Sequence, residues 1–219
     1  MPGLRVQADI TVIGAGSAAG FGPGTLTWAT TSDSRHREVS ATMAWTRTST
    51  ELVHQGPFVS LRRDSVLRPD GSAGTYEHVT VDDAARVVAL DGQGQVALVE
   101  DDFYLQQRRV LHLPGGGCGG QDPYNAALRE LEEETGLVAG QLLPLGVIDP
   151  LPSTTSARTH LFLATDLRPG TVQRDDTEVG MTLQWWPIHD AVEAVLAGRI
   201  TEAGSVSALL LAERAHRPY

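Results

Sequence analysis

The chain has 219 residues and a formal net charge of -10, which argues against a nucleic-acid partner because proteins that bind nucleic acid usually carry a basic surface. Hydrophobic residues make up 41% of the chain, enough to build a core, yet no apolar run approaches the roughly 20 residues that span a bilayer, so we expect no membrane partner. Cys118 is the single cysteine and the N-terminus lacks a basic-then-apolar leader, so we expect a cytoplasmic protein without an internal disulfide.

The first part of the chain differs from the rest in composition. Residues 1–45 are rich in Gly, Ala, Ser and Thr and show no sustained hydrophobic period, which predicts a flexible extension. From about Glu51 the pattern becomes regular, and we expect one folded domain over residues 46–219 that begins with β-strands.

Alternating and short apolar runs predict strands along most of this domain. In chain order they lie at residues 54–71 (one or two strands ending in a Pro-Asp-Gly turn), 75–81, 85–100 (a β-hairpin around a Gly-rich turn), 109–117 (a short strand running into a glycine loop), 141–148, 159–167 and 181–188. Two helical patterns follow, at residues 189–197 and 205–216.

One further helix is predicted in the middle of the chain, over residues 122–135. Asp122 and Pro123 suit the N-cap and the first helical position, and Gly136 suits the C-cap. Strands, then a loop and helix, then strands, then helices predict an α/β fold in which helices pack on a mixed sheet.

Three carboxylates stand on one face of this helix. Glu130, Glu133 and Glu134 are spaced i, i+3 and i+4, so their side chains are neighbours and repel one another. A hard divalent cation such as Mg²⁺ or Mn²⁺ would relieve that repulsion through carboxylate oxygens and could bridge the protein to a diphosphate. The alternative is a solvated acidic helix face, which is what most charge runs are.

The residues around these carboxylates resemble the Nudix box, G-x5-E-x7-R-E-U-x-E-E-x-G-U, where U is a bulky aliphatic residue. Residues 129–137, Arg-Glu-Leu-Glu-Glu-Glu-Thr-Gly-Leu, fill its second half completely. The resemblance implies a Nudix-type α/β/α sandwich with a mixed β-sheet. It also implies that Glu130, Glu133 and Glu134 bind Mg²⁺ or Mn²⁺ and serve catalysis, and that Arg129 orients a glutamate by a salt bridge.

The first half of the box departs from this pattern. Counting back from Arg129, the box glycine falls on Gly115, but the early glutamate falls on Gln121, and the glycine loop is one residue shorter than usual. Gln121 is a metal-ligand candidate through its carbonyl oxygen, although it brings no charge. If the gap lies elsewhere in the loop, Asp122 takes the place of the glutamate.

The resemblance extends over about residues 51–215 to the ADP-ribose pyrophosphatase branch of the family. It implies a catalytic base on the acidic loop, with Glu178 as first candidate and Asp176 as second, and a homodimer formed through residues 51–80. Candidates for substrate binding are Arg108 and Arg109, whose guanidinium groups suit phosphates, together with Gly115 and Gly116.

The expected activity is divalent-metal-dependent hydrolysis of a nucleoside diphosphate linked to another moiety, ADP-ribose or a related nucleotide sugar, with release of a nucleoside monophosphate. The acidic segment Glu100-Asp101-Asp102 stands where the branch has a basic one, so the distal group could be another sugar or even a cation. The alternative is a catalytically weak or inactive Nudix-fold module that binds nucleotides, which Gln121 and the short loop favour.

Overall fold

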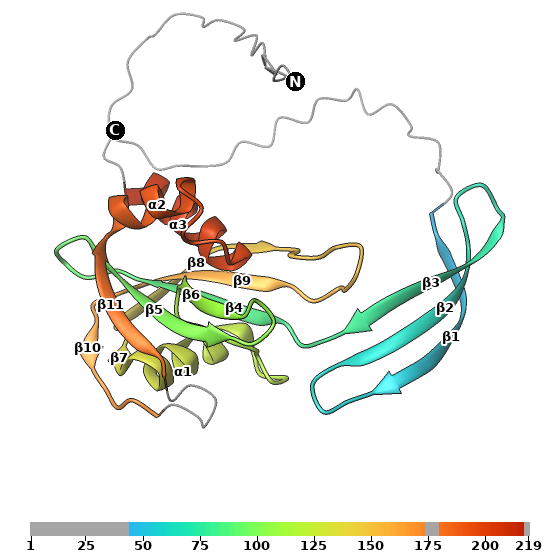
Figure 1. Cartoon of the computed structure of the whole chain (residues 1–219), viewed down its shortest axis with the longest axis horizontal. Helices are drawn as coiled ribbons and strands as arrows, with labels where there is room; N and C mark the ends of the chain where they lie inside the picture. Colours follow the sequence, from blue (N-terminus) through green and yellow to red (C-terminus); the bar gives the residue numbers. More distant parts are fainter. Residues whose placement is uncertain (1–43, 174–179, 217–219) are drawn as a thin grey trace, which may run out of the picture. The chain divides into compact units, whose positions relative to one another are not determined.

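The computed structural model describes residues 44–173 and 180–216 (Figure 1). The predicted extension at residues 1–45 lies outside this part of the chain except for Ala44 and Trp45, and the candidate bases Asp176 and Glu178 lie outside it too. Within the described ranges, the helices are too short or too polar to cross a membrane.

The folded part begins with a three-stranded antiparallel sheet in the order β1-β2-β3. Its strands are β1 (Thr46–Gln55), β2 (Ser60–Leu67) and β3 (Ala73–Thr80). The range 54–71 contains β2 and ends in the predicted Pro-Asp-Gly turn, where Gly71 adopts a φ of 82°, whereas β1 lies mostly before this range and was not predicted. Backbone and side-chain hydrogen bonds from β3, Val79 N to Thr154 O and Tyr76 OH to Ser153 O (both 2.8 Å), connect this sheet to a later loop.

Eight strands and three helices follow within residues 81–173 and 180–216. The strands are β4 (Ala84–Ala89), β5 (Gln95–Phe103), β6 (Arg108–His112), β7 (Leu137–Val138), β8 (Gln141–Ile148), β9 (Thr159–Thr165), β10 (Arg168–Pro169) and β11 (Thr182–Pro187). One sheet, in the order β4-β9-β8, is mixed, because β4 is parallel to β9 while β8 is antiparallel to it. A second sheet, β11-β5-β6, is antiparallel, and β10 pairs with β7.

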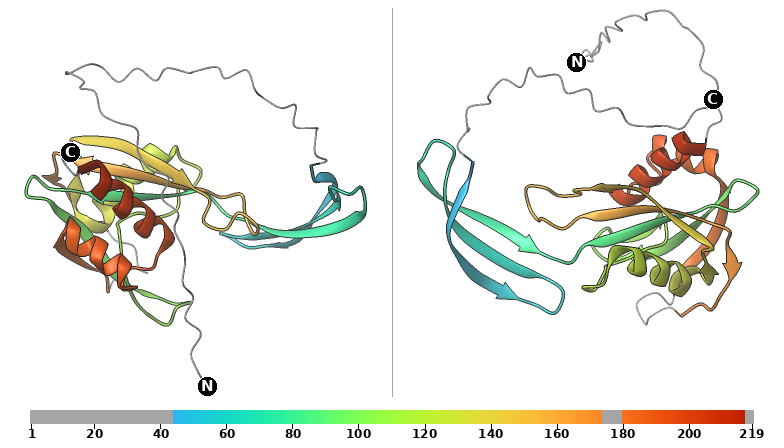
Figure 2. Two further views of the ribbon diagram at one scale, coloured as in Figure 1. Left: turned by 90° about the horizontal axis from the view of Figure 1, so that it is seen from above. Right: turned by 180° about the vertical axis from the view of Figure 1, so that it is seen from behind.

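The helices cover both faces of these strands. Helix α1 (Pro123–Thr135) lies on one side, and α2 (Ile188–Leu196) and α3 (Ala203–His216) lie on the other, as Figure 2 shows from two directions. Each side has its own apolar core: Val88 packs with residues of α2 and α3, whereas its neighbour Val87 packs with Leu131 of α1. Successive side chains of a strand point to opposite faces, so β4 contributes to both cores. The α/β/α sandwich with a mixed sheet is thereby confirmed.

The predicted hairpin at residues 85–100 is wrong. β4 and β5 belong to different sheets and share only an isolated bridge between Leu90 and Val96. β4 instead pairs along its whole length with β9, and its other edge receives the glycine loop that precedes α1. Both edges of β4 are therefore occupied, and a continuous ladder with β5 has no free backbone groups to use.

The helix that carries the three carboxylates forms as its sequence predicts. The Asp122 carboxylate accepts hydrogen bonds from the backbone N–H groups of Tyr124 and Asn125 at 3.0 and 3.4 Å. Gly136 ends the helix in the left-handed conformation (φ 70°), and its N–H donates to Glu132 O at 2.8 Å. Both ends of α1 are capped, which fixes the helix start and therefore the position of every side chain on it.

A histidine lies in the interior at the end of β6. His112 is 3% exposed, its Nδ1 is 2.8 Å from Leu113 O, and its ring lies 5.1 Å from that of Phe103. Burial lowers the pKa of this imidazole below its ordinary value, and the nearby charge of Arg86 lowers it further.

We predict that His112 makes the folded state less stable in mild acid. In the unfolded chain the imidazole takes up a proton near its ordinary pKa of 6.5, while the buried imidazole resists protonation. Stability is therefore lost as the pH falls below 6.5, by at most about 1.4 kcal/mol for each pH unit. Urea unfolding at pH 7.5 and 5.0 should show a smaller loss for His112→Gln than for the native chain. Equal losses would contradict this account.

Candidate active site

Helix α1 presents two buried carboxylates to the glycine loop that precedes it, residues 113–118 (the box loop). Glu130 is 8% exposed and Glu134 is 4% exposed. The Gly115 N–H donates to Glu134 Oε2 at 2.9 Å. A Cβ on Gly116 would lie 2.7 Å from the Glu130 carboxylate oxygens, so a side chain there would displace this carboxylate.

Arg129 joins the carboxylates to one another. Its NH2 donates to Glu130 Oε1 at 2.8 Å, its NH1 to Glu133 Oε2 at 2.7 Å, and its Nε to Gln121 Oε1 at 3.2 Å. NH2 also reaches Gly117 O at 3.2 Å. The Arg129 guanidinium therefore bonds two of the three expected metal ligands. It also bonds Gln121, which replaces the early glutamate of the box, and the box loop.

The charges of this cluster oppose the cost of burying it. Burial raises the pKa of the Glu130 carboxyl, and the adjacent Arg129 charge counters that effect. Burial also acts to lower the pKa of Arg129, but its hydrogen bonds and charge interactions with Glu133 and Glu130 outweigh burial, so the pKa stays above its ordinary value. The positive charge close to Glu130 and Glu133 is thus the guanidinium of Arg129, which is part of the site.

The box loop is held in place by the edge of β4. Ala85 N–H donates to Gly116 O at 2.9 Å, Val87 N–H donates to Pro114 O at 3.0 Å, and Cys118 N–H donates to Asp83 O at 2.7 Å. Asp83 in turn bonds His160 of β9 at 3.0 Å. The loop therefore lies along β4 like an added strand. These hydrogen bonds fix where its peptide groups lie relative to the carboxylates of α1.

The donor set of this site fits a hard divalent cation. Glu130 and Glu133 bond the same guanidinium, so their oxygens are neighbours, and carboxylate oxygens are what Mg²⁺ and Mn²⁺ prefer. In the part of the chain that the structure describes, no three His, Cys, Asp or Glu side chains already stand in a metal-binding arrangement. The carboxylates are engaged instead by Arg129 and by Gly115 N–H.

The two arginines predicted to contact phosphate form hydrogen bonds and ion pairs with residues outside this cluster. Arg109 contacts Glu100 and Asp102, both at 3.3 Å, and donates to Gly180 O at 3.2 Å. Arg108, exposed, donates to Thr201 Oγ1 at 2.9 Å. The acidic segment that sequence reasoning treated as a substrate clue is thus largely an internal partner of Arg109. The pairing of β5 with β6 explains this contact, because Asp102 lies directly opposite Arg109 in the sheet.

Three residues behind the box loop were not expected from the sequence: Arg86 and Ser205, which contact the loop, and Glu202, which holds Arg86. Arg86 bonds Gly115 O and Glu202, and Ser205 accepts a hydrogen bond from Leu113 N–H at 2.8 Å. The one available signal was a lone arginine within the otherwise apolar run of β4. A buried charge in such a run needs a partner.

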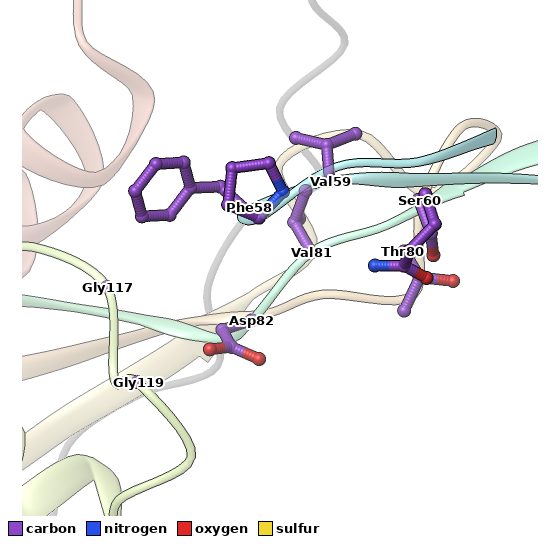
Figure 3. A pocket seen from close by; sticks show the side chains of 10 residues that line it. Phe58, Val59, Ser60, Thr80, Val81, Asp82, Gly117 and Gly119 are labelled. Atoms are coloured by element: carbon purple, nitrogen blue, oxygen red, sulfur yellow. The ribbon is translucent and has the colours of Figure 1, made fainter.

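A cavity of about 630 Å³ lies beside the box loop. Figure 3 shows its walls: Phe58 and Val59, from the turn between β1 and β2, lie on one side, and Asp82, Gly117 and Gly119 lie on the other. Phe58 is 86% exposed, an unusual state for a large apolar ring. The cavity thus combines apolar side chains with the loop that touches the carboxylates.

We predict that Gly115 is the least replaceable glycine of the box loop. Its φ is +136°, and a Cβ would lie 2.2 Å from Ala85 O on β4, so Gly115→Ala must displace the loop. A loss of roughly 1–3 kcal/mol or more in the free energy of unfolding is expected, measured with urea. Gly117→Ala is the matched control, because a Cβ there meets no described atom within 4 Å. Equal effects of the two substitutions would refute the prediction.

Known proteins share both the sequence pattern and the architecture. Residues 80–209 match the model of the NUDIX domain, and residues 45–79 match that of the nucleoside diphosphate sugar hydrolase N-terminal domain. The ADP-ribose pyrophosphatase of Mycobacterium tuberculosis is 34% identical over 165 residues, which cover 74% of this chain and 80% of that protein. The ADP-ribose pyrophosphatase of Bacillus subtilis is 27% identical over 161 residues, 73% of this chain and 87% of that protein.

Two other relatives extend the comparison. A hydrolase of Streptomyces rubellomurinus, named for CMP-5'-(N-acetyl-N-hydroxy-3-aminopropyl)phosphonate, is 26% identical over 171 residues, 77% of this chain and 82% of that protein. The crystal structure of an ADP compounds hydrolase superposes with a TM-score of 0.68 at 23% identity and covers 78% of this chain and 93% of that one. At 23% identity, this structural similarity supports the fold alone.

Proposed function

We propose, from the premise that this chain belongs to the Nudix hydrolase family, that it is a divalent-metal-dependent pyrophosphohydrolase acting on ADP-ribose or a related nucleotide sugar. The observation that carries the proposal is the cluster of Glu130, Glu133 and Glu134, gathered by Arg129 against a glycine loop. Hydrolysis of the diphosphate would release a nucleoside monophosphate and a phosphorylated remainder.

The residues divide the work by their chemistry. Bound Mg²⁺ or Mn²⁺ would polarise the diphosphate and lower the pKa of an attacking water. Glu130, Glu133 and Glu134 supply hard oxygen ligands for it, and Gln121 offers an uncharged carbonyl oxygen. Arg129 keeps two of these carboxylates oriented, as its hydrogen bonds to both indicate. We assign the role of general base to Glu178, with Asp176 as second candidate.

The box loop brings the substrate to these groups. Gly115 and Gly116 leave the loop without side chains where it meets Glu134 and Glu130, so a diphosphate can approach the backbone closely. The adjoining cavity of about 630 Å³ offers the ring of Phe58 and the side chain of Val59 to the flat, apolar face of a nucleobase. Arg108, which is exposed, is proposed to contact phosphate, and Arg109 to support it from its ion pairs.

Support for the substrate class comes from the relatives. Two of them are named as ADP-ribose pyrophosphatases and one as a hydrolase of a CMP-linked phosphonate. All three names describe cleavage of a nucleotide joined to a second group. An N-terminal sheet matching that of nucleoside diphosphate sugar hydrolases favours a sugar as this group.

The proposal includes a cytoplasmic homodimer formed through the N-terminal sheet. β1 is exposed along its whole length and presents Leu52 and Val53, which are 49% and 40% exposed. A strand with unpaired backbone groups and apolar side chains at the surface is suited to a protein contact. A single cysteine, Cys118, agrees with a reducing compartment.

A second function, a nucleotide-binding module with little or no catalysis, is favoured by one observation. Gln121 replaces the early glutamate of the box, and its amide oxygen accepts a hydrogen bond from Arg129 rather than adding negative charge to the cluster. With one charge fewer, the site attracts a divalent cation less strongly.

Turnover on a substrate panel separates these two functions. ADP-ribose, other nucleotide sugars, dinucleoside polyphosphates and nucleoside triphosphates would be tested with Mg²⁺ or Mn²⁺, and again with EDTA. We expect nucleoside monophosphate release from a nucleotide sugar that EDTA abolishes. Binding without cleavage across the panel would favour the second function, and Gln121→Glu would then be expected to restore turnover.

We predict that Glu134→Gln lowers kcat by on the order of 100-fold or more, because the amide removes one negative charge from the metal ligands. Glu132→Gln is the matched control on the same helix. The Glu132 carboxylate accepts a hydrogen bond from Thr171 N–H at 3.3 Å, whereas Arg129 bonds Glu130 and Glu133, so turnover should change little in this control. Full metal-dependent turnover by Glu134→Gln would remove this residue from the site.

A further inference from the structure

A partly buried ion pair lies behind the box loop, on the side away from the carboxylates of α1. Arg86 is the only charged residue of β4, and its side chain is 14% exposed. Its Nε lies 3.2 Å from Glu202 Oε2, and its NH1 donates to Ala85 O at 3.1 Å and to Gly115 O. The Arg86 guanidinium therefore joins a residue 116 positions away in sequence to the glycine of the box loop.

Glu202 anchors this pair to the start of α3. Its Oε2 accepts hydrogen bonds from the Ser205 N–H and Oγ–H, both at 2.7 Å, and its Oε1 accepts one from the Gly204 N–H at 3.0 Å. A carboxylate that accepts backbone N–H bonds in the first turn caps a helix. Glu202 is thus held rigidly by the helix and in turn holds Arg86.

The start of α3 reaches the box loop at two points. Ser205, which is fully buried, accepts a hydrogen bond from Leu113 N–H at 2.8 Å. Arg86, held by Glu202, takes the carbonyl of Gly115 two residues further along. A Cβ on Gly204 would lie 2.8 Å from Arg86 Cγ, which shows how closely the helix start packs against this arginine.

Gly115 connects the network to the site. Its carbonyl bonds Arg86 and its N–H donates to Glu134 Oε2 at 2.9 Å. The backbone on both sides of Gly115 is therefore oriented by charged groups, although its φ of +136° is open only to glycine. If the carbonyl contact were lost, the chain could turn about this residue and carry the N–H away from Glu134.

We infer that Arg86, Glu202 and Ser205 are positioning residues for the Nudix site. They tie helix α3 to residues 113–116 and so set the orientation of the peptide that holds Glu134. The inference rests on the proposed function, because it assigns these residues a role in the metal-dependent centre of that proposal. Their hydrogen bonds run to the box loop, to β4 and to the start of α3, so they act on the carboxylate cluster through Gly115.

A positioning role has a distinct experimental signature. Replacing a residue that orients metal ligands without contacting the metal typically lowers metal affinity or activity by 10–100-fold. We expect Arg86→Met and Glu202→Gln each to weaken Mn²⁺ binding by about 10-fold or more, and to lower kcat while leaving the KM for substrate little changed. Mn²⁺ binding would be measured by titration calorimetry, without substrate.

Two controls separate positioning from general stability. Val88→Ala, two residues along the same strand, removes packing in the apolar core but none of the hydrogen bonds to the box loop. It therefore shows how far Mn²⁺ binding falls when the melting temperature falls and these hydrogen bonds remain. The double variant Arg86→Met/Glu202→Gln removes both charges, which avoids a buried charge left without its partner. We expect it to recover part of the melting temperature but none of the Mn²⁺ affinity. Arg86→Lys, which keeps a positive charge, should rescue binding in part.

Amide hydrogen exchange, followed by NMR, gives a readout that needs no metal. Exchange at Gly115 should quicken in Arg86→Met and Glu202→Gln, while exchange at the core residue Leu98 should change no more than it does in Val88→Ala. Native Mn²⁺ affinity, or losses no greater than those of Val88→Ala, would overturn the inference. If the native chain itself bound no Mn²⁺ and hydrolysed nothing, the proposed function would fail, and hydrogen exchange at Gly115 would still decide whether the network holds the loop.

Discussion

The site depends on the burial of carboxylates that a folded protein would ordinarily keep in water. Glu130 and Glu134 are nearly inaccessible, and an unpaired charge at such a place costs several kcal/mol. The structure compensates each differently: Arg129 neutralises Glu130, and the backbone N–H of Gly115 bonds Glu134. Both solutions require the box loop to lie close against α1. Much of the remaining architecture can be understood as the means of holding it there.

β4 is the element that holds the loop. One edge of this strand pairs in parallel with β9, and the other receives the backbone of Pro114 and Gly116. Its side chains enter the cores on both faces. A strand bonded at both edges and packed on both faces has little freedom to move, which makes it a rigid support for the loop. This use of β4 also explains why the hairpin with β5 does not form.

The charges near the site are more internally paired than the net charge of -10 suggests. Arg109 is shared by Glu100 and Asp102, and Arg129 is shared by Glu130 and Glu133. The pairing of Arg109 with two carboxylates sets the local shape of β5 and β6. The acidic segment of β5 is therefore largely engaged within the protein, whereas the ring of Phe58 beside the box loop is left exposed.

Features that depend on near neighbours could be predicted from the sequence. The helix from Pro123 to Thr135, its caps at Asp122 and Gly136, and the shared face of Glu130, Glu133 and Glu134 follow from contacts within four residues. The longer strands and the two helices after α1 also lie close to their predicted positions, whereas the two-residue strands β7 and β10 were not predicted. The α/β/α arrangement followed from the order of elements and from the box motif.

Which distant groups meet follows from the tertiary structure and not from local sequence. Pairing of β4 with β9, the use of its other edge by the box loop, and the contact of Arg86 with Glu202 across 116 positions all join segments that no local pattern relates. A hydrophobic pattern states which face of a strand is buried, but not which strand lies beside it. The partners of Arg86, Arg109 and Gln121 were set by packing in three dimensions, and with them the geometry of the site.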